Sequence, residues 1–157
     1  VGVHEIVPAL LAPKGLIAGP APSAELLASA EYAVGLARRA GELDLGQAAV
    51  VSGRRVIALE DIAGTDALLQ RVATYRRFGF AADGLSRLVL AKVAKPDQPH
   101  AVDLPAIGPK TVANARRAGI AIIAVQAGAT LLIERQKLFA AAAAARLPIV
   151  GLKASDG

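Results

Sequence analysis

From residue 48 onward, short runs of β-branched and aliphatic residues alternate with longer segments that have helical spacing. The runs with strand composition are 48–51, 56–59, 88–93, 120–125 and 148–152, with a shorter one at 131–133. The segments with helical spacing are 65–78, 109–118 and 134–146. Strands that alternate with helices bury their apolar sides against one another in layers. The pattern therefore predicts an α/β fold.

The first two strand-like runs predict an antiparallel hairpin. Only Ser52-Gly53-Arg54-Arg55 separates the run at 48–51 from the run at 56–59, and a segment of this kind can turn. The later strands are each separated from the next by a longer segment, most of them with a helix. We therefore expect a mixed sheet with an antiparallel hairpin and flanking helices.

The first 22 residues are rich in proline and glycine. The residues concerned are Pro8, Pro13, Gly15, Gly19, Pro20 and Pro22. That density predicts a linker or hinge over 1–22 with at most one short helical turn, at 4–12. Ser23 can cap a helix over 24–40 through its hydroxyl oxygen, and Gly41 can end it. A folded domain is therefore predicted over 23–157.

The composition excludes several classes of protein. Hydrophobic residues make up 54% of the 157 residues, which is enough for a buried core. The chain has no cysteine, which excludes disulfides, thiol nucleophiles and zinc sites built on cysteine. Aromatic residues are only 3% of the chain, which argues against a stacking surface for single-stranded nucleic acid. The net charge of +5 favours anionic partners such as phosphates and acidic lipid surfaces.

Two further features concern the ends of the chain and its longest apolar stretch. The chain starts at Val1 and contains no methionine, so we expect a processed or excised piece that lacks an upstream domain. The apolar stretch at 118–133 is interrupted by Gly119, Gln126, Gly128 and Thr130, which is unlike a membrane-spanning helix. The sequence contains neither a Gly-x-Ser-x-Gly elbow nor a Gly-x-Gly-x-x-Gly fingerprint.

The segment 92–111 carries more chemistry than an ordinary loop, with lysines, aspartates, a histidine and prolines between a strand and a helix. Lys92 and Lys95 lie three residues apart at the strand end, where they could grip a pyrophosphate or simply be solvated. Asp103 has apolar neighbours, so its carboxylate is either paired with a lysine in a structural turn or poised for function. The functional alternatives are a metal ligand or a base toward water.

Two turns offer further candidate sites. Gly64 lets the backbone approach a ligand at the start of a predicted helix, and the carboxylates of Glu60, Asp61 and Asp66 suit Mg²⁺ or Mn²⁺. The alternative is a plain capping loop with Thr65 or Asp66 as the cap. The second turn, Gly128-Ala129-Thr130, follows a buried strand, where open α/β sheets bind ligands, although a tight turn fits equally.

Five short motifs, in this order along the chain, resemble one enzyme family. They are Leu45-Gly-Gln47-Ala-Ala-Val-Val, Gly64-Thr-Asp66-Ala-Leu, Lys92-Val-Ala-Lys95-Pro, Val102-Asp103-Leu-Pro-Ala-Ile-Gly108-Pro and Ala127-Gly128-Ala-Thr130-Leu. The series resembles the carboxyl-terminal domain of the UDP-2,3-diacylglucosamine pyrophosphatases of lipid A biosynthesis, in their alphaproteobacterial form. The resemblance spans nearly the whole chain.

The resemblance implies a hydrolase that uses Mg²⁺ or Mn²⁺ to cleave UDP-2,3-diacylglucosamine into UMP and 2,3-diacylglucosamine 1-phosphate. It implies a cytoplasmic homodimer, peripheral at the inner membrane, whose second, amino-terminal domain faces this one across the lipid-linked substrate.

By position, the resemblance implies that Asp103 and Asp66 are catalytic and hold the metal. The substrate-binding residues that it implies are Gln47, Gly64, Thr65, Lys92, Lys95, Gly128 and Thr130. The glutamate that the family often has before Gly-Thr-Asp is Ala63 here, and Glu60 and Asp61 are the nearby carboxylates.

Two other functions fit parts of the sequence. A non-catalytic α/β module that binds a nucleotide or phospholipid would use the same lysines and glycines, and its carboxylates would be structural. A basic nucleic-acid-binding domain is disfavoured because aromatic residues are scarce and the cations form no stripe. Metal-dependent turnover separates the hydrolase from the binding module.

Overall fold

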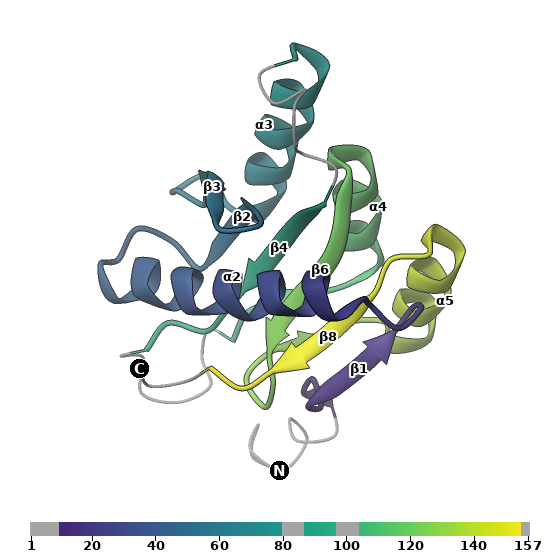
Figure 1. Cartoon of the computed structure of the whole chain (residues 1–157). Helices are drawn as coiled ribbons and strands as arrows, with labels where there is room; N and C mark the ends of the chain where they lie inside the picture. The colour runs from purple at the N-terminus through teal and green to yellow at the C-terminus, as the bar shows by residue number, and fades with distance from the viewer. Residues whose placement is uncertain (1–9, 80–86, 97–103, 155–157) are drawn as a thin grey trace.

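The computed structural model describes residues 10–79, 87–96 and 104–154, which form a six-stranded sheet with helices on both faces (Figure 1). The elements are β1 (Gly15–Ala18), α2 (Ala24–Glu42), β2 (Ala48–Ser52), β3 (Arg55–Leu59), α3 (Thr65–Arg77), β4 (Leu88–Lys92), β5 (Ala106–Ile107), α4 (Pro109–Ala118), β6 (Ile120–Gln126), β7 (Leu131–Leu132), α5 (Arg135–Ala145) and β8 (Ile149–Leu152). The strand order in the sheet is β1-β8-β6-β4-β2-β3, and β5 pairs with β7 apart from it.

The sheet is mixed, as the sequence predicts. Strands β4, β6 and β8 are parallel to one another. The hairpin β2–β3 is antiparallel and attaches to β4 through β2, while β1 is antiparallel to β8 at the other edge. The predicted α/β class, the hairpin and the flanking helices are therefore confirmed.

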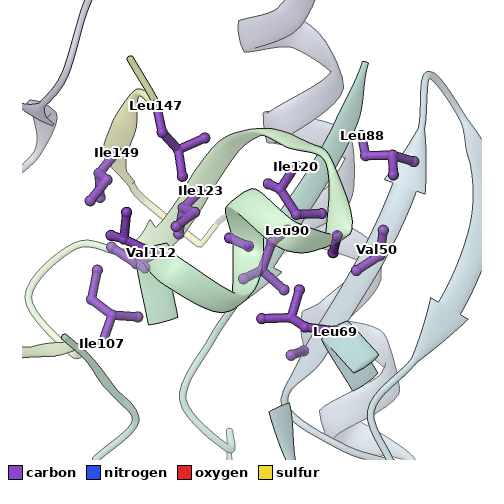
Figure 2. Packing of buried hydrophobic residues seen from close by; sticks show 14 of the residues in the cluster. Val50, Leu69, Leu88, Leu90, Ile107, Val112, Ile120, Ile123, Leu147 and Ile149 are labelled. Atoms are coloured by element: carbon purple, nitrogen blue, oxygen red, sulfur yellow. The ribbon is translucent and has the colours of Figure 1, made fainter. Parts of the chain in front are cut away.

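Alternating side chains of the central strands supply two separate cores. On one face, Leu90 and Ile123 pack among the apolar residues of α3, α4 and α5 (Figure 2). On the other face, Ala91 and Ile122 pack against α2, which crosses the sheet in Figure 1. Successive residues of a strand point to opposite faces, so a strand that is covered on both faces needs a continuous apolar run rather than an alternating one.

Glycine and proline near the start of the chain did not prevent a strand from forming. The expected linker over 1–22 includes Gly15–Ala18, which the structure places in the sheet as β1, paired with β8. The chain before β1 passes close to β8 because residue 151 is a glycine: a Cβ atom there would lie 1.9 Å from the Pro13 carbonyl oxygen. Most of the predicted turn at 4–12 lies outside the described residues, and the domain boundary stays a prediction.

Two other elements differ from expectation. Helix α2 begins after Ser23, whose hydroxyl accepts a hydrogen bond from the Leu26 N–H, but it runs through Gly41 to Glu42. The two residues of β5 were expected to belong to an irregular loop, and they form a strand because they pair with β7. For β5, the pairing with a strand elsewhere in the fold decided the outcome.

Replacing Leu90 by alanine tests the core beneath α3 and α4. The side chain is fully buried, so its loss leaves a cavity as well as losing apolar burial. We expect the free energy of unfolding to fall by about 2–5 kcal/mol, measured by chemical denaturation. Leu43→Ala is the matched control, because Leu43 is 70% exposed and its loss is expected to change stability by less than about 0.5 kcal/mol. Equal effects of the two changes would contradict this packing.

Candidate functional site

The candidate site lies at the edge of the sheet where the parallel strands end. Strands β4, β6 and β8 all have their carboxyl ends there. Because β2 is antiparallel to β4, the start of β2 and the end of β3 lie at the same edge. Four predicted motifs, which are far apart in the sequence, are therefore brought together. This is the edge at which open α/β sheets bind ligands.

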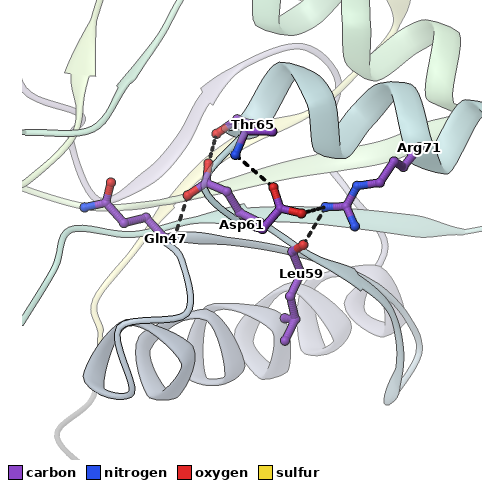
Figure 3. Close-up of polar contacts among 7 residues, drawn as sticks. Gln47, Leu59, Asp61, Thr65 and Arg71 are labelled. Carbon is purple, nitrogen blue, oxygen red and sulfur yellow. Dashed lines mark hydrogen bonds and ion pairs between the residues drawn. The ribbon is translucent and has the colours of Figure 1, made fainter.

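Glu60 joins two of these motifs directly. Its carboxylate accepts a hydrogen bond of 2.8 Å from the Gln47 N–H and one of 2.5 Å from the Thr65 hydroxyl (Figure 3). The chain at Gly46 passes so close that a Cβ atom there would lie 2.3 Å from the Glu60 carbonyl oxygen. Glu60 thus fixes the start of α3 against the start of β2.

Asp61 stabilises the turn before α3. One carboxylate oxygen accepts from the Ala63 N–H at 2.9 Å, and the other lies 3.6 Å from Arg71 (Figure 3). Arg71 also donates to the Leu59 carbonyl at 2.7 Å, which ties α3 to the end of β3. Gly64 has a φ of 92°, a conformation that L side chains rarely adopt, and this explains the glycine in the predicted motif.

Asp66, in the first turn of α3, is held by two residues of α4. Its Oδ1 atom accepts a hydrogen bond of 3.0 Å from the Asn114 amide, and its Oδ2 atom lies 3.4 Å from the Lys110 ammonium. Asn114 in turn accepts a hydrogen bond of 3.0 Å from Arg117. The amino-terminal turns of α3 and α4 therefore lie side by side, and Asp66 lies between them.

Lys92 is the last residue of β4 and points toward the face covered by α3 and α4. Its ammonium donates to the Ala106 carbonyl at 3.0 Å. Burial lowers the pKa of Lys92 below its ordinary value, while the nearby carboxylates of Glu60 and Asp66 act in the opposite direction. A partly dehydrated cation with carboxylates nearby is well suited to balance the charge of an anionic ligand.

Lys95 lies at the same edge but is bound to another element. Its ammonium is 2.6 Å from Asp44, in the connection between α2 and β2, and this contact lowers the pKa of the Asp44 carboxyl. Asp44 has a φ of 58°, a left-handed conformation that aspartate tolerates better than most residues. The neighbouring Pro96 lies against Gly41, where a Cβ atom would be 3.3 Å from the proline ring. Lys95 therefore also anchors the segment that follows β4.

The turn after β6 holds its shape through internal hydrogen bonds. Thr130 is fully buried, and its hydroxyl donates to the Gln126 carbonyl at 2.9 Å, while the Gln126 side chain accepts from the Ala94 N–H at 3.0 Å. Gly128 is exposed and has a φ of 75°. A ligand at this turn would therefore meet the backbone of Gly128, whereas Thr130 would act by supporting it.

The remaining predicted residue, Asp103, lies outside the described residues, as does the histidine of the segment 92–111, His100. The flanking Pro96 and Leu104 are described, and the Leu131 N–H donates to the Pro105 carbonyl at 2.8 Å. Across the described ranges, no three carboxylate or histidine side chains come together as a metal site. Asp66 already faces an ammonium and an amide, so the described residues alone do not fit a divalent cation.

Exposed apolar side chains surround this polar edge. Leu43 and Leu45 lie in the connection from α2 to β2, Ile62 lies in the turn before α3, and Ile133 packs beside Gly108 at the start of α4. Four large exposed apolar residues around one polar site are a pattern typical of an interaction surface.

A pocket of about 240 Å³ between α2 and the β2–β3 turn is lined by residues none of which belongs to the predicted site. Within the described ranges, no helix is both long enough and apolar enough to cross a membrane.

Sequence reasoning named one residue of this site without its role and missed another. Glu60 was named only as one of three clustered carboxylates, and its position directly after a strand was the signal that it lies at the ligand-binding edge. Asn114 was not identified, because a single polar residue in a helix carries no signal until its neighbour is known. Its burial, at 7% exposure, shows that it faces inward.

Comparison with known proteins gives two consistent results. Residues 13–150 match the family described as the LpxI C-terminal domain. The chain is 40% identical, over an alignment of 153 residues that covers 96% of the chain, to a protein of Caulobacter vibrioides named UDP-2,3-diacylglucosamine pyrophosphatase LpxI. The matched region is 54% of that relative, so the chain spans about half of the relative's length.

Proposed function

The chain belongs to the LpxI C-terminal domain family, and on that premise we propose that it is the catalytic domain of a UDP-2,3-diacylglucosamine pyrophosphatase. The reaction adds water across the pyrophosphate and yields UMP and 2,3-diacylglucosamine 1-phosphate, a step of lipid A biosynthesis. The observation that carries this proposal is the convergence of the Gln47, Gly64-Thr65-Asp66, Lys92 and Gly128 motifs at one edge of the sheet.

The charge distribution of the site supports hydrolysis of an anhydride. A pyrophosphate carries several negative charges, so attack by water is slow until cations and N–H groups neutralise the charge that develops. Lys92 supplies a cation that is already partly dehydrated and fixed by the Ala106 carbonyl. The start of α3, where none of the described side chains caps the helix, offers N–H groups for phosphate oxygens.

The roles of the two aspartates are part of the proposal. Asp103, together with Asp66, would position the attacking water, or Asp103 would accept a proton from that water. Mg²⁺ or Mn²⁺, held by Asp103 and Asp66, would supply further charge neutralisation when bound. Because the described residues do not complete a cation site, we assign no individual step of the reaction to the metal.

The apolar residues around the site are consistent with the remaining features of the substrate. Leu43, Leu45, Ile62 and Ile133 offer surface for acyl chains or for an amino-terminal domain placed over the same edge. The share of the relative that the chain spans is consistent with such a domain. We further propose a cytoplasmic homodimer, peripheral at the inner membrane, because its lipid substrate resides there.

A binding module is the second candidate function. The ion pairs of Lys95 with Asp44 and of Lys110 with Asp66 favour it, since both show cations and carboxylates satisfying one another. In that case the protein would bind the UDP-sugar without turning it over.

Release of UMP from UDP-2,3-diacylglucosamine tests the proposed function. We expect the protein that contains this chain and the proposed amino-terminal domain to release UMP with Mg²⁺ or Mn²⁺, measured by chromatography. A chelator should abolish the release, and added metal should restore it. The isolated chain, assayed beside it, shows whether the second domain is required. Binding of substrate without UMP, with each metal tried, would favour the binding module.

A further inference from the structure

Asn114 is a buried polar residue on α4 whose two amide atoms are both occupied. Its Nδ2 atom donates to Asp66 Oδ1, and its Oδ1 atom accepts from Arg117, each at 3.0 Å. The side chain is only 7% exposed, and Thr130 is the one other buried polar residue in the described part of the chain. A buried amide is costly unless it is hydrogen-bonded, so its presence in the packed α3–α4 contact requires a reason.

The geometry of α4 shows what the amide does. Lys110 and Asn114 are four residues apart and so lie on the same face of the helix. They contact the two different oxygens of the Asp66 carboxylate, Lys110 at 3.4 Å and Asn114 at 3.0 Å. The Lys110 side chain is 80% exposed, whereas Asn114 is held by packing and by Arg117. The rigid partner therefore sets the orientation of the carboxylate.

We propose that Asn114 is a positioning residue for the reaction, which holds the Asp66 carboxylate in the orientation that the active site requires. The inference rests on the proposed function, in which Asp66 is a catalytic residue. Without the amide, Asp66 could rotate in the first turn of α3 toward solvent, since it is itself exposed. Misplacement of a catalytic group by about 1 Å can reduce a rate by as much as about a hundredfold.

The test is a kinetic comparison of variants of the two-domain protein. For Asn114→Ala we expect kcat to fall about tenfold, with KM changed by less than about twofold. Asn114→Asp keeps the shape and still accepts from Arg117, but it cannot donate to Asp66 in its charged form and repels it, so kcat should fall further. Val112→Ala is the matched control, because Val112 is buried on the same helix and its apolar side chain cannot form a hydrogen bond with Asp66. Its kcat should equal that of the wild type.

A double-mutant cycle separates positioning from a structural role. If Asn114 acts through Asp66, adding Asn114→Ala to Asp66→Asn should reduce kcat no further than Asp66→Asn alone. Losses that multiply would overturn the inference, as would an unchanged kcat in Asn114→Ala while the wild type is active. A wild-type protein that releases no UMP would overturn the proposed function, and the inference with it.

Discussion

Replacing Asp103 by alanine is expected to reduce UMP release by at least about a hundredfold while leaving the protein folded. The residue lies in the Val-Asp-Leu-Pro motif, one of the five on which the resemblance to the family rests, and it is the proposed base or metal ligand. Removing a carboxylate that positions water or a cation removes stabilisation that exists only in the transition state, so kcat should fall more than KM rises. The assay is UMP release by the two-domain protein.

Two controls make the Asp103 result specific. Asp103→Asn keeps the volume of the side chain and removes only the charge, so a loss similar to that of the alanine variant would assign the effect to the carboxylate. Glu31→Ala removes an exposed carboxylate from α2 and should leave activity unchanged. An Asp103→Ala variant that retained more than about a tenth of wild-type activity would be incompatible with the proposed role.

Replacing Lys92 by methionine is expected to lower kcat/KM by about a hundredfold without lowering stability. The activity should fall because the variant loses the fixed cation at the end of β4, which the Ala106 carbonyl orients. Methionine fills nearly the same volume, so the packing beneath α3 and α4 is retained. The measurements are UMP release and the free energy of unfolding at neutral pH.

The stability expectation follows from the direction of the pKa shift. Burial lowers the pKa of Lys92 in the folded protein below its ordinary value of 10.5, so folding disfavours its charged form. This cost is fully present below the folded-state pKa and disappears as the pH rises to the unfolded-state value. Lys92→Met should therefore be at least as stable as the wild type at neutral pH, and the difference should shrink toward pH 10.5.

Lys137→Met is the matched control for this prediction. Lys137 is exposed on α5 and pairs with Glu134 three residues earlier, so its loss should change neither activity nor stability appreciably. A Lys92→Met variant that was clearly destabilised at neutral pH would show that the cation is chiefly structural. An unchanged kcat/KM would exclude it from phosphate binding.

The elements of this fold with a strong local signal were predictable from the sequence. Strand β6 is a continuous apolar run whose successive side chains pack into the cores on the two faces of the sheet. The apolar residues of α3 are spaced so that they lie on one buried side of the helix. The weaker elements were not predictable. Strand β1 is rich in the signals of a linker and forms only because β8 offers it a partner. The two residues of β5 likewise depend on β7.

The candidate site, like the fold, has features that the sequence predicts and features that it does not. Its motifs could be read from the sequence because Gly64-Thr65-Asp66 and Lys92 have recognisable residue types and spacing. The contact partners of each side chain could not be predicted from the sequence. Lys95 was predicted together with Lys92, yet it pairs with Asp44, 51 residues earlier in the chain. Asp66 was predicted as a metal ligand or a helix cap, and the structure shows it bound by Asn114 of α4.

The sequence by itself determined the α/β class, the mixed sheet, the family and the candidate residues of the site, because periodicity and short motifs are local properties of the chain. Only the tertiary structure decided that the motifs meet at one edge, that Glu60 joins two of them, and that Asn114 donates a hydrogen bond to Asp66. The physical reason is that hydrogen bonding and burial depend on which residues become neighbours, and strand order, rather than sequence distance, sets those neighbours.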